Sequence, residues 1–121
     1  EPTGAMRCLH DAGGWSSVRV SADAGLDLDD DERDLDRAGL QRAMTEHAGV
    51  LRSDESLVEA DESVARVAVP AGDEPLASLV TVAEALVQAA IAREESRGAH
   101  ARTDFPDTDD AEFRLRIVVR R

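Results

Sequence analysis

Three consecutive segments of this chain carry apolar residues at the spacing of one helix face, and this pattern constrains the fold more than any other feature. Residues three and four positions apart lie on the same side of an α-helix, so an apolar repeat at that spacing predicts a helix with one buried face. The first segment starts near Asp36. Its expected inward face consists of Leu40, Ala43, Met44, His47, Val50 and Leu51.

Two further helices are expected after the first. Ser53 suits the N-cap of the second, because a short hydroxyl side chain accepts hydrogen bonds from free first-turn amides, and Pro70 ends this helix. Asp73 and Pro75 suit the start of a third and longest helix, with Gly98 as its left-handed C-terminal cap. The expected inward faces are Leu57, Ala60, Val64 and Val67 in the second helix, and Leu76, Leu79, Val80, Ala83, Leu86, Val87, Ala90 and Ile91 in the third.

Three amphipathic helices joined by short turns bury their apolar faces against one another. Only 2% of the chain is aromatic, so the core has to be built from Leu, Val and Ala. We therefore predict a mainly α protein, an antiparallel three-helix bundle of the spectrin-repeat kind over residues 34–106. Residues 1–33 are expected to be a linker or poorly ordered arm, and residues 107–121 an extended tail. Apolar alternation around Val18 and around Ile117 suggests a short strand in the arm that pairs with the tail.

The charge of the chain limits its partners and its compartment. The formal net charge is −12, and such a surface repels nucleic acid and anionic membranes. Cys8 is the single cysteine, which excludes an internal disulfide. The longest nearly apolar stretch, around Ala89 to Ala92, falls well short of a membrane span, and no signal-peptide order opens the chain. We expect a soluble cytoplasmic protein that binds neither nucleic acid nor membrane.

Several polar residues are possible sites, but each has a simpler explanation. His47 is expected to be a core-edge histidine with a backbone partner. Cys8 and His10 lie two positions apart in a glycine-rich segment, where chance is the better explanation. The acidic run from Asp27 begins like a calcium loop but lacks its Gly and Glu, so a solvated charge run is favoured. We therefore expect no catalytic, cofactor-binding or metal-binding residue in this chain.

Polar and ionisable residues crowd the end of the third helix. A plain exposed pair of Glu94 and Arg97, at i and i+3, is one interpretation. The density of charged and turn-forming residues favours another, in which this segment docks against a second surface. The candidate docking residues are Glu94, Ser96, Arg97, Gly98, His100, Arg102, Asp104 and Pro106.

The run from Arg93 to Pro106, REESRGAHARTDFP, resembles the signature that ends the helical domain of the succinate dehydrogenase, fumarate reductase and L-aspartate oxidase flavoproteins. Leu40 to Met44, Gly49 to Arg52 and Leu79 to Ala92 resemble the first and third helices of the L-aspartate oxidase branch, and the end of the tail resembles its actinobacterial members. The resemblance covers residues 36–121.

The resemblance implies the C-terminal helical domain of a flavoenzyme that oxidises L-aspartate to iminoaspartate in de novo NAD biosynthesis. The full-length enzyme would carry FAD, while this chain contains no G-x-G-x-x-G motif and is expected to be inactive alone. Its implied partners are its own flavin-binding and capping domains, with quinolinate synthase as a candidate. The alternatives are the equivalent domain of a succinate dehydrogenase or fumarate reductase flavoprotein, and a free-standing helical interaction module. The opening Glu1, in place of Met, favours a fragment over the free-standing module.

Overall fold

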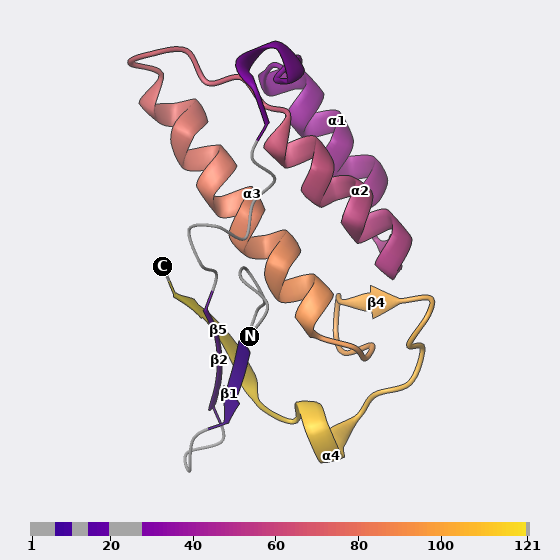
Figure 1. Cartoon of the computed structure of the whole chain (residues 1–121). Coiled ribbons are helices and arrows are strands. Elements are labelled where there is room, and N and C mark those ends of the chain that lie inside the picture. Colours follow the sequence, from indigo (N-terminus) through magenta and orange to yellow (C-terminus); the bar gives the residue numbers. More distant parts are fainter. Residues whose placement is uncertain (1–6, 11–14, 20–27, 121) are drawn as a thin grey trace.

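The computed structural model describes residues 7–10, 15–19 and 28–120 (Figure 1). Its main elements are α1 (Arg37–His47), α2 (Asp54–Ala65) and α3 (Glu74–Ala92), and both α1 and α3 pack against α2. A short 3-10 helix, Asp30–Glu32, precedes α1. The mainly helical class predicted from the sequence is confirmed. The more specific expectation of an antiparallel, spectrin-like bundle stays a prediction.

Each main helix begins at a side chain that caps it. The Oδ1 atom of Asp36 accepts from the amide of Gly39 at 2.8 Å, and Asp73 accepts from the first turn of α3. Ser53 and Ser56 form a reciprocal capping box at the start of α2. These bonds satisfy amides that have no partner within the helix. The starts predicted from Ser53 and Asp73 are confirmed.

The core consists of two adjoining clusters of aliphatic side chains. The predicted inward face of the second helix is buried throughout, with Leu57 and Ala60 fully inaccessible, but α2 ends at Ala65, so Val67 lies beyond it and the predicted end at Pro70 was wrong. The first cluster comprises Leu40, Val64, Val67, Leu76 and Ala83, and the second comprises Ala48, Leu57, Ala60, Val87 and Ala90. A polar contact joins the same two helices, because the buried Gln88 of α3 donates to Asp61 of α2 at 2.8 Å.

The predicted faces of the other two helices were partly wrong. Helix α1 ends at His47, so Val50 and Leu51 lie beyond it and are 82% and 66% exposed. In α3, Leu79 and Leu86 lie at the edge of the apolar stripe and are 38% and 40% exposed, because neither α1 nor α2 covers that side.

The predicted end of α3 was also wrong. The helix ends at Ala92, six positions before Gly98, because Arg93 turns out of the helix with φ −88° and ψ 93°. A buried guanidinium donates instead to the carbonyls that a glycine cap would have satisfied. Gly98 does have a left-handed backbone, with φ 58°, but it lies in the turn between Arg97 and His100.

The described parts of the N-terminal segment pair with the tail. Strands β1 (Arg7–His10), β2 (Trp15–Arg19) and β5 (Arg116–Arg120) form a sheet in the order β1-β2-β5, which lies beside the C-terminal half of α3 (Figure 1). Val18 is opposite Val119 in the parallel β2–β5 pair, which confirms the expected pairing of this strand with the tail. Val20 and Asp27 fall outside the described residues, whereas the rest of the acidic run is described and includes the 3-10 helix Asp30–Glu32.

The sequence division into arm, bundle and tail stays a prediction, but two of its descriptions need correction. The expected arm contains β1 and β2 in its described part. The tail is not extended throughout, since α4 (Asp110–Phe113) forms one helical turn, capped by Asp109.

Helix α3 is long and apolar, although it is shorter than predicted. By length and composition it could cross a membrane, with a mean hydropathy of 1.6 over 18 residues. The core helix of a soluble protein passes the same test, and α3 contributes Leu76, Ala83, Val87 and Ala90 to the core. The expectation that no segment approaches the length of a membrane span was therefore wrong.

One small pairing brings distant segments together at the end of α3. Strand β3 (Leu51–Arg52) connects α1 to α2, and β4 (Ala101–Arg102) follows α3. The two pair in parallel, with Arg52 opposite Arg102. The α1–α2 connection is thereby fixed beside the signature segment.

Candidate functional site

The polar corner is the cluster of charged and hydrogen-bonding residues where α3 ends. It consists of Arg52, Arg93, Glu95, Ser96, Arg97, His100, Arg102 and Asp104. All but Arg52 belong to the signature segment, and Arg52 joins them through the β3–β4 pairing. Two of its charged groups are inside the protein, because Arg102 is 2% exposed and Glu95 is wholly buried. Burying a charge is costly unless it is paired and hydrogen-bonded, so their partners define what the corner does.

Arg102 closes the C-terminal end of α3. Its Nη1 atom donates to the carbonyl oxygens of Ala90 at 3.0 Å and Ile91 at 3.2 Å. These belong to the last turn, where carbonyls lack partners within the helix and the helix dipole favours a cation. The guanidinium also lies over the ring of Phe105, 5.1 Å from its centroid. Arg102 therefore acts as a side-chain cap for α3.

Asp104 links this cap to the start of α2. Its two oxygens accept hydrogen bonds from Nε and Nη2 of Arg102 at 2.9 and 2.8 Å. The same carboxylate accepts from the amide of Asp54, in the first turn of α2, at 3.1 Å. The bonds from Arg102, with smaller help from backbone amides, lower the pKa of Asp104 to about 2. The pair therefore holds the end of one helix against the beginning of another.

Glu95 links the end of α3 to the tail. It accepts from Arg93, from Nε of Arg97 at 3.0 Å and from the amide of Asp109 at 2.9 Å. Burial alone would raise the pKa of Glu95, but the bonds from Arg97, the Asp109 amide and Arg93 together lower it. This carboxylate is therefore held ionised inside the protein.

The two arginines around Glu95 reach further along the tail. Arg93 donates to the carbonyl oxygens of Phe113 at 2.9 Å and Leu115 at 2.7 Å. Arg97 reaches Asp110 at 2.7 Å. The tail is thereby attached to the end of α3 before it enters β5.

His100 connects the corner to the α1–α2 connection. Its Nε2 lies 2.9 Å from the carbonyl oxygen of Arg93, and its Nδ1 lies 3.1 Å from Nη1 of Arg52. A carbonyl only accepts, so Nε2 carries the proton and Nδ1 accepts from Arg52. Burial lowers the pKa of His100, and the charges of Arg52 and Arg102 add to this, while the bond to the Arg93 carbonyl opposes it. The imidazole is therefore neutral and positions Arg52.

Ser96 satisfies the backbone of the turn. Its Oγ accepts from the amide of Arg102 at 2.9 Å and donates to the carbonyl oxygen of Phe105 at 2.8 Å. Thr108 in turn donates to the carbonyl of Ser96 at 2.7 Å. The signature segment is therefore folded back on itself by its own hydrogen bonds.

The candidate docking residues fall into two groups in the structure. Ser96, Arg97, His100, Arg102 and Asp104 have partners within this chain, whereas Glu94, Gly98 and Pro106 are exposed. The plain Glu94–Arg97 pair is not what forms, since Arg97 binds Glu95 and Asp110. The docking role of the set stays a prediction.

Sequence reasoning missed three members of this corner. Glu95, Arg93 and Arg52 were not among the predicted docking residues, although all three lie within the segments that resemble the family. Helical periodicity treats a charged residue after an apolar stripe as solvated, so it gives no signal for a buried carboxylate. Two arginines, Arg93 and Arg97, each two positions from Glu95, were the available clue.

Three further candidate residues are His47, Cys8 and His10. His47 lies 3.3 Å from Glu59 and 3.9 Å from Glu46, so its partners are carboxylates and not the expected backbone group. The side chains of Cys8 and His10 fall outside what the structure describes. Among the described residues, no three potential metal ligands of the His, Cys, Asp or Glu type come together.

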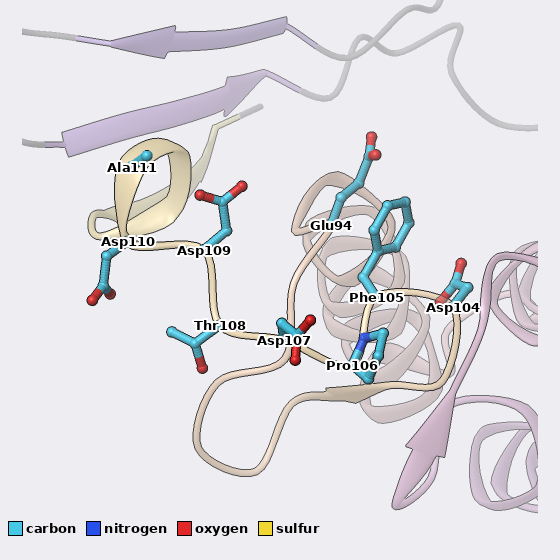
Figure 2. Close-up of a pocket in the computed structure, with 9 residues that line it drawn as sticks. All are labelled: Glu94, Asp104, Phe105, Pro106, Asp107, Thr108, Asp109, Asp110 and Ala111. Carbon is cyan, nitrogen blue, oxygen red and sulfur yellow. The ribbon is translucent and has the colours of Figure 1, made fainter.

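An acidic hollow of about 500 Å³ borders the corner on its exposed side. It is lined by Glu94, Asp104, Phe105, Pro106, Asp107, Thr108, Asp109, Asp110 and Ala111. Figure 2 shows its carboxylates spread around the rim, not directed at one point. This arrangement is typical of a solvated acidic surface.

The corner does not fit the pyrophosphate of a flavin. Such a group needs free amides or guanidinium donors. Here the donors of Arg93, Arg97 and Arg102 are committed to acceptors of the same chain. We therefore assign no chemical step to the described residues.

Comparison with known proteins supplies the biological context. Residues 74–121 match the family model described as "Fumarate reductase flavoprotein C-term". The L-aspartate oxidase of Streptomyces coelicolor is 40% identical over an alignment covering 69% of this chain and 17% of its own length, and that of Caulobacter vibrioides is 38% identical over 67% and 15%. A fumarate reductase flavoprotein subunit of Mycobacterium tuberculosis is 34% identical over 70% and 18%.

The fold and the corner define a mainly helical domain that is held together by its own buried ion network. The chain belongs to the succinate dehydrogenase and fumarate reductase flavoprotein family, of which it is a C-terminal domain similar to that of the L-aspartate oxidases. It spans less than a fifth of the length of the Streptomyces and Caulobacter relatives.

Proposed function

We propose that this chain is the C-terminal structural and docking domain of an L-aspartate oxidase. The observation that carries the proposal is the 38–40% identity to L-aspartate oxidases from Streptomyces, Caulobacter and Rhodospirillum, against 34% for the Mycobacterium fumarate reductase subunit and 36% for a Rickettsia succinate dehydrogenase subunit. In the full-length enzyme, bound FAD would take a hydride from L-aspartate and leave iminoaspartate, at the start of de novo NAD biosynthesis. This domain would stabilise the enzyme without supplying a reacting group.

The internal bonding of the corner supports a structural role. Arg102, Asp104 and Glu95 tie together α2, α3 and the tail. Because these groups have partners within the chain, the domain would present a preformed surface to the rest of the enzyme. Its proposed partners are the flavin-binding and capping domains and quinolinate synthase, and its proposed compartment is the cytoplasm.

A substrate comparison tests the proposal. The natural polypeptide that carries this sequence should contain flavin and oxidise L-aspartate, with oxygen or fumarate as acceptor, in preference to succinate. The 121-residue chain assayed beside it should be colourless and inert. Preference for succinate would instead support the second candidate, a succinate dehydrogenase or fumarate reductase flavoprotein, which the Mycobacterium and Rickettsia relatives favour.

A further inference from the structure

We propose that the chain docks onto the flavin-binding part of its flavoprotein through the exposed side of α3 and through Arg52, and not chiefly through the signature segment. This inference rests on the proposed function in one respect, namely that a flavin-binding part exists. It assigns the docking surface, which comparison with relatives leaves open.

The first element of this surface is an apolar stripe along α3. Leu79, Val82 and Leu86 are 38%, 63% and 40% exposed. At 100° per residue they lie within one narrow sector of the helix, beside the sector that packs on α2. Exposed apolar side chains are common singly, but a row of three on one helix marks a contact surface.

The second element is a pocket of about 280 Å³ at the C-terminal end of the stripe. Leu86 belongs to both, and Ile117 of β5 also lines the pocket. The polar lining comes from Arg52, Arg93 and His100. The pocket therefore combines apolar and basic side chains in its lining.

Arg52 gives the pocket its affinity for an anion. Arg93, Arg97 and Arg102 each pair with a carboxylate, whereas Arg52 has no carboxylate partner among the described residues. Its hydrogen bonds go to two neutral acceptors, since Nε donates to the carbonyl of Gly49 at 3.1 Å and Nη1 donates to Nδ1 of His100 at 3.1 Å. Nη2 has no partner among the described residues, so a guanidinium held in place by its other nitrogens can donate to a carboxylate.

The occupant is the flavin-binding part of the same flavoprotein, presenting an apolar ridge with an acidic side chain at one end. The Streptomyces and Caulobacter relatives align with about two thirds of this chain but only 17% and 15% of their own length, so most of each relative lies outside the matched region. The chain carries a net charge of −12, so an acidic partner would be repelled by most of its surface but accepted at Arg52, which lines the pocket beside the apolar stripe. Charge therefore selects the register in which the apolar stripe is covered.

Side-chain footprinting with a carbene or hydroxyl radical tests the stripe. Labelling of Leu79, Val82 and Leu86 should fall severalfold in the natural flavoprotein relative to the 121-residue chain. Val58 of α2, which is 43% exposed, is the matched control and should label equally in both. Equal labelling of the stripe in both proteins would overturn the proposal.

Other occupants give different results that would also overturn it. Protection that disappears on dilution of the flavoprotein would assign the stripe to a second copy. Protection that appears only with phosphatidylcholine vesicles would assign it to a membrane.

Substitutions test the energetic role of the surface. Val82→Ser should leave the thermal transition of the 121-residue chain unchanged but speed proteolysis between the domains of the flavoprotein. Arg52→Gln should also speed this proteolysis, by about tenfold, which is equivalent to about 1.4 kcal/mol. Val58→Ser and Arg42→Gln, at exposed positions of α2 and α1, are the controls. Unchanged proteolysis in both test variants would contradict the inference. Aspartate oxidation measured on the same samples reports separately on the proposed function.

Discussion

Replacing Arg102 with Met removes the cap of α3 while nearly keeping the volume of the side chain. The carbonyls of Ala90 and Ile91 then lose their donor, and the carboxylate of Asp104 loses the hydrogen bonds from the guanidinium. Each helix-end carbonyl left without a donor costs about 1–3 kcal/mol, about 3–5 kcal/mol for the two together, whereas the carboxylate of Asp104 is 30% exposed and keeps water as a partner. Domains of this size have a free energy of unfolding of roughly 5–15 kcal/mol, so the substitution removes a large part of this stability.

Thermal unfolding of the 121-residue chain, followed by circular dichroism, measures this loss. At about 4 °C per kcal/mol, the transition of Arg102→Met should fall by about 12–20 °C. Arg102→Lys keeps the charge but not the planar pair of donors, so its transition should lie between those of the parent chain and Arg102→Met. Arg42→Met, at an exposed position of α1, should stay within about 0.5 kcal/mol of the parent. A transition for Arg102→Met that matches the Arg42→Met control would refute the reasoning.

Three further predictions follow from the same contacts. Glu95→Gln leaves two arginines without a buried counter-charge and should cost about 3 kcal/mol, seen as faster hydrogen exchange in the tail; unchanged exchange there would disprove the attachment. The pKa of His100 is lowered in the folded state, so the unfolded chain binds the proton first, and unfolding free energy should decrease as pH falls below about 6.5 toward the folded-state pKa; His100→Gln should remove this slope, and a slope that persists would count against the assignment. Gly49→Ala would place a Cβ 2.5 Å from the carbonyl oxygen of Thr45, so the turn has to shift at a cost of about 1–3 kcal/mol in urea unfolding; an unaltered midpoint would show that the turn adapts freely.

Local patterns predicted the helices well because their physical causes are local. Ser53 and Asp73 cap helices through bonds that span three residues, and such signals are visible in sequence. The buried face of α2 follows directly from 3.6-residue periodicity. Pairing of Val18 with the tail could also be anticipated, since both segments alternate apolar and polar residues.

The end of α3 and the polar corner could not be read in the same way. Gly98 is a good cap by composition, but Arg102 satisfies the last carbonyls from ten residues beyond the helix, so the helix stops at Ala92. Glu95 is buried because two arginines and the amide of Asp109 surround it. Contacts of this kind depend on the folded path of the chain, which periodicity does not contain. The resemblance marked the right segment but not which of its residues are internal.

The central claim is that the signature segment is bonded within this chain, and exchange of arginine side-chain protons tests it most directly. In the isolated 121-residue chain near neutral pH, the Nε–H of Arg102 should be protected from exchange with water, because it is buried and bonded to Asp104 at 2.9 Å. The Nε–H of Arg42, at an exposed position of α1, should exchange freely. Exchange of Arg102 as fast as that of Arg42 would show that the corner forms only against a partner, and would contradict the account.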